Sequence, residues 1–427
     1  MRKRLLLVAF HFPPLQGSTG VHRSLAFARY LERYGWDVTV LTATPGAYPR
    51  QSLDNNALIP GHVRVVRALA LDAQRHLSLF GRYPRALATP DRWRSWIYAG
   101  VQAGRRVVRE WSPHAIFSTY PIASAHELAL RIARDSGLPW VADFRDPMGQ
   151  DNYPEDAGVR RAYWDLERRI LGQCSAVTVT TEGTAELYRH RYAAFPGQRI
   201  RVVPNGFDEQ AFQPWPPEPA AEIRPRGATI FLHSGNLYPY ERNPEHFFAA
   251  VAQLRAEGQV GPDTVQFKLR GGGYPDRYQP MLAQHGIADL VHLLPGLPYR
   301  DALREMHQSD YLMLFQAANC NRQIPAKLYE YLYVGRPVLA FTDPAGDTGR
   351  LLAGLGIESI APLDDTAAIK ARILEALRQA REGTAYVPPH EDVMRFSRAG
   401  TTALLAGLLD EVSTAAPRGD AATARHG

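Results

Sequence analysis

The stretch Leu5–Thr42, "LLLVAFHFPPLQGSTGVHRSLAFARYLERYGWDVTVLT", decides the fold class. Its first six residues are continuously apolar, which is typical of a strand buried on both faces. After a turn-rich loop, apolar residues recur at helical spacing up to Gly35, a residue that commonly ends a helix. A second apolar run follows at once. The order strand, helix, strand predicts a βαβ unit, and therefore a parallel sheet.

The same alternation recurs along the chain and predicts two α/β domains. The Pro-rich and charged stretch 211–227 interrupts it and is the predicted linker. We expect an N-terminal Rossmann-like domain over 1–210, completed by a C-terminal helix at about 390–413, a second Rossmann-like domain over 228–389 and a disordered tail over 414–427. The two parallel sheets are expected to face a central cleft, where open α/β sheets bind their ligands.

Composition narrows the class of protein. Of 427 residues, 45% are hydrophobic and 22% are charged, as in ordinary globular proteins. Two cysteines are too few for a disulfide scaffold, and no apolar run is long enough to span a membrane. We therefore expect a cytoplasmic protein. Residues 1–210 hold 28 Lys and Arg against 19 Asp and Glu, so this half could meet a phosphorylated substrate, an anionic membrane face or nucleic acid, or simply have a solvated basic surface.

The stretch Ile324–Leu339, "IPAKLYEYLYVGRPVL", carries the clearest binding signal. Pro325 fits the first position of a helix, whose positive end would suit a phosphate. Lys327 lies in the first turn, and Glu330 shares its face three residues later. A carboxylate there could accept hydrogen bonds from both hydroxyls of a ribose. The alternative is an ordinary amphipathic helix with a surface Lys/Glu pair.

This stretch resembles the donor-binding segment of retaining GT-B glycosyltransferases of the group 1, family 4-like class, bacterial polysaccharide type. Four more segments, in the family's order, extend the resemblance over nearly the whole chain. They are the opening loop and helix already quoted, "PWVADFRDP", "VVPNGFDEQAFQP" and "HSGNLYPYERNPEHFFAAV". The resemblance implies a GT-B fold and transfer of a sugar from a nucleotide-diphosphate donor to a lipid-linked or oligosaccharide acceptor.

The resemblance also implies roles for single residues. Lys327 and Arg242 would hold the diphosphate and stabilise the charge that grows as the sugar leaves. Glu330 would bind the ribose. The donor would further contact Gly17, Gly20, Asn236, Ile324 and Pro325.

On the acceptor side, His126 would meet the sugar or the acceptor; a capped or surface histidine is the alternative. Asp143, Arg145 and Asp146 would orient the acceptor, or would form an internal ion-pair network.

Two departures from the family pattern leave other functions open. Arg322 stands where the family has the first glutamate of its Glu-X7-Glu motif, and Asn236 stands where an arginine is frequent. Arg322 makes a catalytically idle subunit that binds a nucleotide sugar one alternative. A GT-B sugar-nucleotide epimerase is another, although it would need a carboxylate pair near the diphosphate that the sequence does not assign.

No metal or other cofactor is expected, because the sequence holds no Asp-X-Asp and no HExxH pattern. No nucleic-acid-binding motif occurs. Residues 82–111 interleave arginines with aromatic residues, a pattern that fits either peripheral contact with the anionic inner membrane face or an ordinary covering helix.

Overall fold

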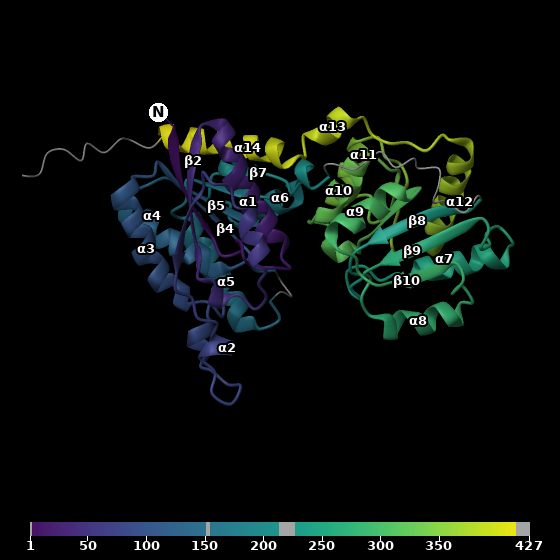
Figure 1. Cartoon of the computed structure of the whole chain (residues 1–427), viewed down its shortest axis with the longest axis horizontal. Helices are drawn as coiled ribbons and strands as arrows, with labels where there is room; N and C mark the ends of the chain where they lie inside the picture. Colours follow the sequence, from purple (N-terminus) through teal and green to yellow (C-terminus); the bar gives the residue numbers. More distant parts are fainter. Residues whose placement is uncertain (1, 151–153, 213–226, 416–427) are drawn as a thin grey trace, which may run out of the picture. The chain divides into compact units, whose positions relative to one another are not determined.

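The computed structural model describes residues 2–150, 154–212 and 227–415 (Figure 1). The chain forms two compact units, one built from the residues up to Pro204 and from Arg398 onward, the other from Asn205–Ser397. Most of the predicted linker 211–227 and of the predicted tail 414–427 lies outside the described residues.

The first unit contains a parallel sheet of seven strands in the order β3-β2-β1-β4-β5-β6-β7. All five residues of β4 and all six of β5 are buried, as expected for central strands covered on both faces. The predicted βαβ unit is confirmed, because β1 pairs in parallel with β2. The strands are β1 Lys3–Ala9, β2 Trp36–Ala43, β3 Arg64–Ala68, β4 Ala115–Thr119, β5 Trp140–Arg145, β6 Ala176–Val179 and β7 Ile200–Val202.

Glycine in the left-handed conformation ends two helical segments, one of them at the predicted Gly35. After α1 a short 3₁₀ segment ends at Gly35, with φ of 80°, and α4 ends at Gly137, with φ of 69°. The helices of this unit are α1 Thr19–Tyr30, α2 Ala73–His76, α3 Ser95–Trp111, α4 Ala123–Ser136, α5 Ala157–Leu171, α6 Glu182–Arg191 and α14 Arg398–Ala415.

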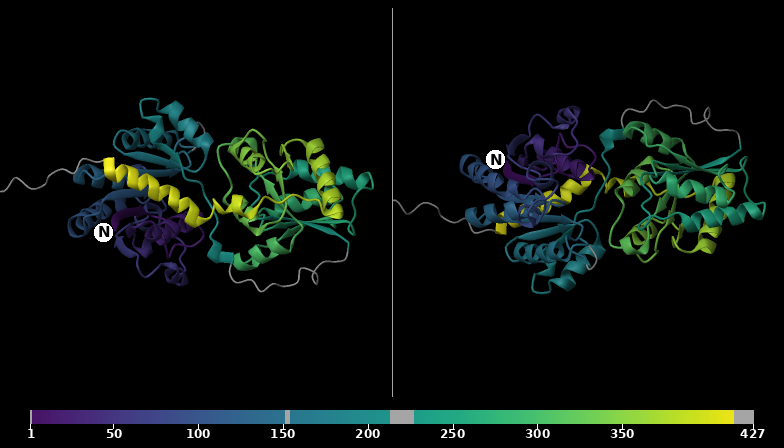
Figure 2. Two further views of the ribbon diagram at one scale, coloured as in Figure 1. Left: turned by 90° about the horizontal axis from the view of Figure 1, so that it is seen from above. Right: turned by 90° about the horizontal axis from the view of Figure 1, so that it is seen from below.

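The predicted C-terminal helix is divided in two. Its first part, α13 (His390–Met394), belongs to the second unit, and α14 lies across the first unit in both views of Figure 2. Phe207 N donates to Phe396 O at 3.2 Å, and Phe207 forms a bridge with Ser397. Residues 396–397 therefore pair with another segment, and the helix does not continue through them.

The arginine- and aromatic-rich segment forms α3, which covers the sheet. Trp96 is fully buried, whereas Tyr98 is 59% exposed. A Cβ on Gly100 would lie 2.0 Å from Leu128 Cδ1, so the absence of a side chain lets α3 approach α4 closely. Among the described residues, no helix is both long and apolar enough to cross a bilayer.

The second unit has a parallel sheet of six strands in the order β10-β9-β8-β11-β12-β13. Its strands are β8 Thr229–Ser234, β9 Val265–Arg270, β10 Val291–Leu294, β11 Tyr311–Phe315, β12 Val338–Phe341 and β13 Ile360–Ala361. Its helices are α7 Glu245–Ala256, α8 Pro275–Gln284, α9 Tyr299–Gln308, α10 Ala326–Val334, α11 Asp347–Gly354, α12 Thr366–Glu382 and α13.

Each sheet reverses its strand order once, between β1 and β4 in the first unit and between β8 and β11 in the second. Ligands of open α/β sheets bind at the carboxyl ends of the strands, at such a switch point. The loops after β8 and β11, and those after β1 and β4, are therefore where the site residues are expected to lie.

Candidate nucleotide-sugar site

In the second unit, α10 begins at the switch point and carries Lys327 in its first turn. Pro325 precedes the helix as its N-cap, with φ of −57° and ψ of 128°, one position earlier than predicted. The carbonyl of Pro325 accepts from Leu328 N at 2.9 Å, so the helix starts directly behind the proline. At either position the missing proline N–H removes no helical hydrogen bond.

His233, at the end of β8, determines where the Lys327 side chain lies. His233 Nδ1 is 2.9 Å from Met313 O, and since a carbonyl only accepts, Nδ1 carries the proton. His233 Nε2 then offers a lone pair to the Lys327 ammonium, 3.2 Å away. Gly235 has φ of 118°, which favours glycine, and a Cβ there would lie 2.6 Å from Lys327 Nζ, so the lysine side chain would have to move. Sequence reasoning missed His233 and Gly235, although both lie in the "HSG" of a motif already recognised.

The surroundings of Lys327 disfavour its charge in the absence of an anion. Burial, followed by the nearby Arg242 guanidinium, lowers the pKa of Lys327 to about 7, against the opposing effect of Glu330. Burial also lowers the pKa of His233, with Lys327 as the next cause, so this imidazole is neutral. Two cationic groups that repel each other beside a helix N-terminus form a site suited to a diphosphate.

Arg242 and Asn236 come from the loop between β8 and α7. Arg242 Nη1 donates to Asn236 O at 3.3 Å, and the Arg242 guanidinium lies 5.3 Å from the centre of the Tyr238 ring. Ala317 N donates to Glu241 O at 2.8 Å and ties this loop to the loop that follows β11. The predicted cations are thus brought to one end of the sheet.

Glu330 lies one turn further along α10 and accepts a hydrogen bond from the Tyr299 hydroxyl at 2.7 Å. Tyr299 is the first residue of α9, 31 residues earlier in the chain. The Tyr299 hydroxyl holds one oxygen of the Glu330 carboxylate in place, so this carboxylate is positioned to accept hydrogen bonds from hydroxyl groups. Nothing in the local sequence around Glu330 indicated this partner.

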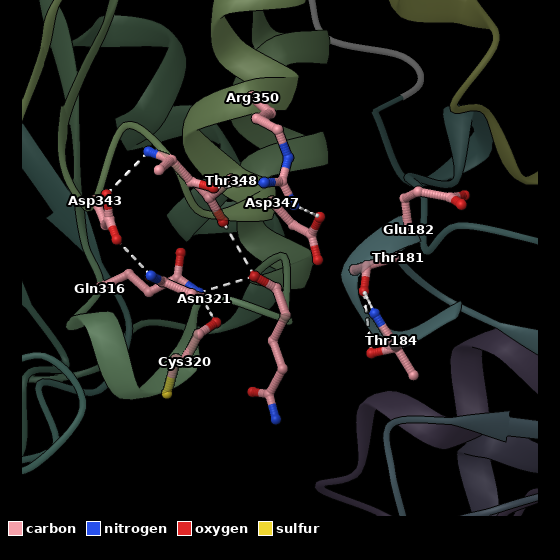
Figure 3. A network of polar contacts seen from close by, with 12 residues as sticks. Thr181, Glu182, Thr184, Gln316, Cys320, Asn321, Asp343, Asp347, Thr348 and Arg350 are labelled. Atoms are coloured by element: carbon pink, nitrogen blue, oxygen red, sulfur yellow. Dashed lines mark hydrogen bonds and ion pairs between the residues drawn. The ribbon is translucent and has the colours of Figure 1, made fainter. Parts of the chain in front are cut away.

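The loop from β11 to α10 is held by a polar network that Figure 3 shows. Gln316 Nε2 donates to the carbonyls of Cys320 and Gln323, at 2.8 Å each, and Thr348 Oγ1 donates to Gln323 O at 3.1 Å. Asn321 donates to Asp343. The same loop carries the exposed Arg322 and the partly buried Ile324, so both residues stand on a well-supported backbone.

In the first unit, Asp143 supports the alternative of an internal ion-pair network. It is fully buried, and its two oxygens accept from Arg23 at 2.9 and 3.0 Å. The hydroxyls of Thr119 and Thr178 donate to the same carboxylate at 2.7 Å each. Burial alone would raise the pKa of Asp143, but the charge and hydrogen bonds of Arg23, together with the hydrogen bonds from Thr119 and Thr178, bring it below its usual value. Asp143 thus stabilises the fold, and its carboxylate oxygens already accept hydrogen bonds from protein groups, which leaves them occupied toward a substrate.

His126 is likewise a core residue. Its side chain is fully buried, and Nδ1 forms a hydrogen bond with Ser118 Oγ at 2.7 Å. Its ring lies against Trp140 and Phe144, and burial lowers its pKa to about 4. The expected catalytic contact of His126 therefore conflicts with its enclosure, and the alternative of a capped histidine describes it better.

Arg145 and the opening loop meet at the carboxyl end of this sheet. A Cβ on Gly20 would lie 2.9 Å from Arg145 Nη1 and 2.7 Å from His11 Nδ1, so the first turn of α1 requires glycine there. Gly17 has φ of 81°, which favours glycine, with no atom near its missing Cβ. Burial raises the pKa of Asp146, and the charge of Arg145 opposes this rise.

Within the described part of the chain, no group of three or more His, Cys, Asp or Glu side chains is arranged to hold a metal ion.

Comparison with known proteins identifies the class. Residues 19–206 match the family model described as glycosyl transferase 4-like domain. Sucrose-phosphate synthase from Thermosynechococcus elongatus is similar over 97% of this chain and 100% of its own, with 15% identity and a TM-score of 0.68. Anabaena HepE in complex with UDP is similar over 96% and 100%, with 15% identity and a TM-score of 0.67.

WaaG, a glycosyltransferase involved in lipopolysaccharide biosynthesis, is similar over 97% of this chain and 100% of its own, with 13% identity and a TM-score of 0.58. No curated protein matches the sequence. The expected GT-B fold is confirmed by these structures, and the match of residues 19–206 to the glycosyl transferase 4-like model agrees with the expected family.

Proposed function

We propose that this protein is a retaining, metal-independent glycosyltransferase that moves a sugar from a nucleoside-diphosphate donor to a lipid-linked or polysaccharide acceptor. The observation that carries the proposal is the arrangement of Lys327, Arg242 and Glu330 around the N-terminus of α10. HepE, a structural neighbour, was solved with UDP and with UDP-glucose. The acceptor class rests on the motif resemblance of the sequence.

Side chains of the second unit would stabilise the diphosphate leaving group. Lys327 and Arg242 would neutralise the diphosphate as the bond to the sugar breaks, and the positive end of α10 would add to their effect. Binding of the diphosphate would hold Lys327 charged despite its surroundings. Glu330, oriented by Tyr299, would accept from the ribose hydroxyls. In a retaining reaction without a protein nucleophile, the departing diphosphate takes the proton of the acceptor hydroxyl on the same face of the sugar.

A thermal-shift screen with UDP-, GDP-, ADP- and dTDP-glucose tests the donor site. We expect one class of nucleotide to raise the melting temperature. Glu330→Gln should weaken binding of that nucleotide about 10- to 100-fold, because a hydrogen bond to a charged group is worth about 1.5–3 kcal/mol. Glu245→Gln is the matched control, since Glu245 lies on α7 of the same unit and pairs with Arg277. Equal affinity of the Glu330 variant and the parent would refute the ribose placement.

Turnover separates the enzyme from the alternatives. The proposed enzyme should release free sugar slowly from the bound donor and transfer it faster when an acceptor is supplied. An idle binding subunit would bind the nucleotide sugar without consuming it, and an epimerase would change the sugar without an acceptor. Either of these results would replace the proposed reaction while leaving the donor site in place.

A further inference from the structure

Three apolar side chains are exposed on one short loop of the first unit. The loop (residues 77–87, the tip loop) follows α2, and Figure 1 shows it projecting beyond that helix. Phe80 is 95% exposed, Leu79 is 73% exposed and Leu87 is 40% exposed. Removing apolar side chains from water is favourable, so their clustering on a projecting loop indicates a surface that contacts a partner.

The turn at the end of the tip loop holds Phe80 in an uncommon conformation. Leu79 N donates to Arg82 O at 2.8 Å, and Arg82 N donates to Leu79 O at 3.0 Å, which closes a two-residue hairpin turn. Both central residues are left-handed, with φ of 51° at Phe80 and 76° at Gly81. Such turns favour asparagine followed by glycine, and a bulky residue at positive φ is strained. The turn itself therefore does not account for a phenylalanine at this position.

The charges beside these apolar side chains are positive. The tip loop contains Arg82 and Arg85 and no acidic residue, and Arg75 lies two residues before it. All three arginines are exposed. Arg85 pairs with Asp156 at the surface, so Arg75 and Arg82 supply the net positive charge. An anionic partner would be attracted to the loop.

The two aspartates that flank the loop in the sequence are engaged by the protein. Asp72 is fully buried, accepts from Gln74 N at 3.0 Å and lies 3.3 Å from Arg92 Nε. Asp91 accepts from Ser124 N at 2.6 Å and from Ser124 Oγ at 2.9 Å, at the start of α4. Both carboxylates thus hold the base of the loop in place.

We infer that the tip loop docks on an anionic lipid bilayer, with Phe80 and Leu79 among the acyl chains and Arg75 and Arg82 among the headgroups. Binding to such a surface grows with the apolar area that is buried and with the positive charge that faces the lipid phosphates. A stable protein–protein interface buries about 800 Å² on each partner, and a single projecting turn offers less. The apolar tip beside arginines therefore fits lipid better than it fits a protein.

The structure divides the arginine- and aromatic-rich segment 82–111 between two roles. Its helix α3 covers the sheet and buries Trp96, whereas the bilayer contact falls on the loop before the helix. The two apolar residues at the end of that loop precede the segment, so the sequence pattern did not include them. Their exposure became evident only from the fold.

The tip loop lies at the end of the first sheet where the candidate site residues of this unit are expected. β3 ends at Ala68 and α3 begins at Ser95, so residues 69–94 connect them at the carboxyl end of the strands. The loops after β1 and β4 lie at the same end, because the sheet is parallel. Bilayer binding goes beyond the proposed function and requires no sugar transfer, so failure of either would leave the other standing.

Flotation of the full chain with lipid vesicles tests the inference. The parent should bind vesicles of phosphatidylcholine with phosphatidylglycerol, and should bind phosphatidylcholine alone more weakly. Phe80→Asn suits the turn but removes the ring, so it should weaken binding at least about tenfold. Leu404→Gln is the matched control, because Leu404 is 52% exposed on α14 of the same unit. Equal binding by Phe80→Asn and the parent, or no binding by the parent, would overturn the inference.

A pair of charge variants tests the arginines. Arg82→Gln should weaken binding to the anionic vesicles about fivefold, the effect of one basic side chain near such a surface. Arg106→Gln changes the net charge equally on α3, where Arg106 pairs with Glu110, and should bind like the parent. Equal weakening by both variants would contradict docking through the tip loop, because net charge alone would then attract the lipid.

Two controls separate lipid docking from other roles of Phe80. Phe80→Trp keeps a ring that suits the bilayer interface and should bind vesicles at least as well as the parent. The melting temperature of Phe80→Asn should be unchanged or higher; a fall would place the ring within the fold and overturn the inference. In sedimentation without lipid, a dimer of the parent that Phe80→Asn dissociates would assign the tip loop to a second copy of the chain and would also overturn it.

Discussion

Because the pKa of Lys327 is lowered, we expect binding of the proposed nucleotide-sugar donor to depend on pH. The free protein has this pKa at about 7, and a bound diphosphate would hold the ammonium charged. Below pH 7 Lys327 is already protonated, so binding needs no proton. Above pH 7 each binding event must take up a proton, and the affinity falls as pH rises.

The size of the effect follows from the titration. About half of the Lys327 side chains are charged at pH 7 and about 1% at pH 9, so the affinity should fall about 50-fold, or about 2 kcal/mol, between these values. Calorimetry in buffers of different ionisation heat should show uptake of about half a proton at pH 7 and about one at pH 9. A nucleotide sugar is the suitable probe, because it lacks the terminal phosphate ionisation near pH 6.

Variants of the same site complete this test. Lys327→Arg keeps its charge at every pH used, so its affinity should stay level. His233→Leu removes the lone pair at 3.2 Å that favours the ammonium, so the fall in affinity should begin at a lower pH. A parent protein whose donor affinity is the same at pH 7 and 9, with no proton uptake, would refute the placement of Lys327 on the diphosphate.

The same pKa shift has a consequence for the stability of the free protein. Between pH 7 and 10.5 the unfolded chain binds a proton at Lys327 that the folded chain has lost. Unfolding then takes up protons, so the contribution of this lysine to stability rises with pH through that window. Lys327→Met should remove this part of the pH dependence.

Two further predictions concern stability and are checked by thermal and denaturant unfolding. Asp143→Asn leaves Arg23 buried without its counter-ion, so the free energy of unfolding should fall by about 3–5 kcal/mol and the melting temperature by on the order of 10 °C. The double variant Arg23→Met, Asp143→Leu removes both charges and should lose less stability. A larger loss in the double variant would contradict this reasoning. Gly100→Ala places a Cβ 2.0 Å from Leu128 Cδ1 and should lower the free energy of unfolding by about 1–3 kcal/mol. Gly407→Ala is the control: no atom lies within 4 Å of the new Cβ, so the free energy of unfolding should rise by about 0.5–1 kcal/mol. An unchanged stability of the Gly100 variant would show that α3 and α4 separate easily.

Patterns local in the chain predicted the fold well. A continuous apolar run marked β1, and Gly35 marked the end of the first helical segment, because both signals depend on only a few neighbouring residues. The C-terminal helix was predicted as one piece because its break depends on Phe207, almost 200 residues away from Ser397. Periodicity alone could not reveal that pairing.

For the candidate sites, sequence reasoning selected the residue types but not their partners. Lys327, Arg242 and Glu330 were proposed from the motif resemblance, and the structure brings them to one end of the second sheet. His233 and Tyr299 were missed because their contacts span 94 and 31 residues. For His126 and Asp143 the sequence left both a substrate contact and a structural role open, because spacing carries no information about burial.

The amino-acid sequence by itself determined that this protein consists of two parallel α/β units, and it singled out the helix of the second unit that we propose binds a phosphate. Hydrophobic periodicity and turn residues encode such elements locally, and the order of elements restricts how parallel strands connect. Only the tertiary structure decided which charges are paired. Asp143 and Arg145 are two residues apart, yet Asp143 is neutralised by Arg23 from α1, whereas Nε of Arg145 has no hydrogen-bond partner among the described residues. Charge state and function depend on which distant side chains folding brings within hydrogen-bonding distance.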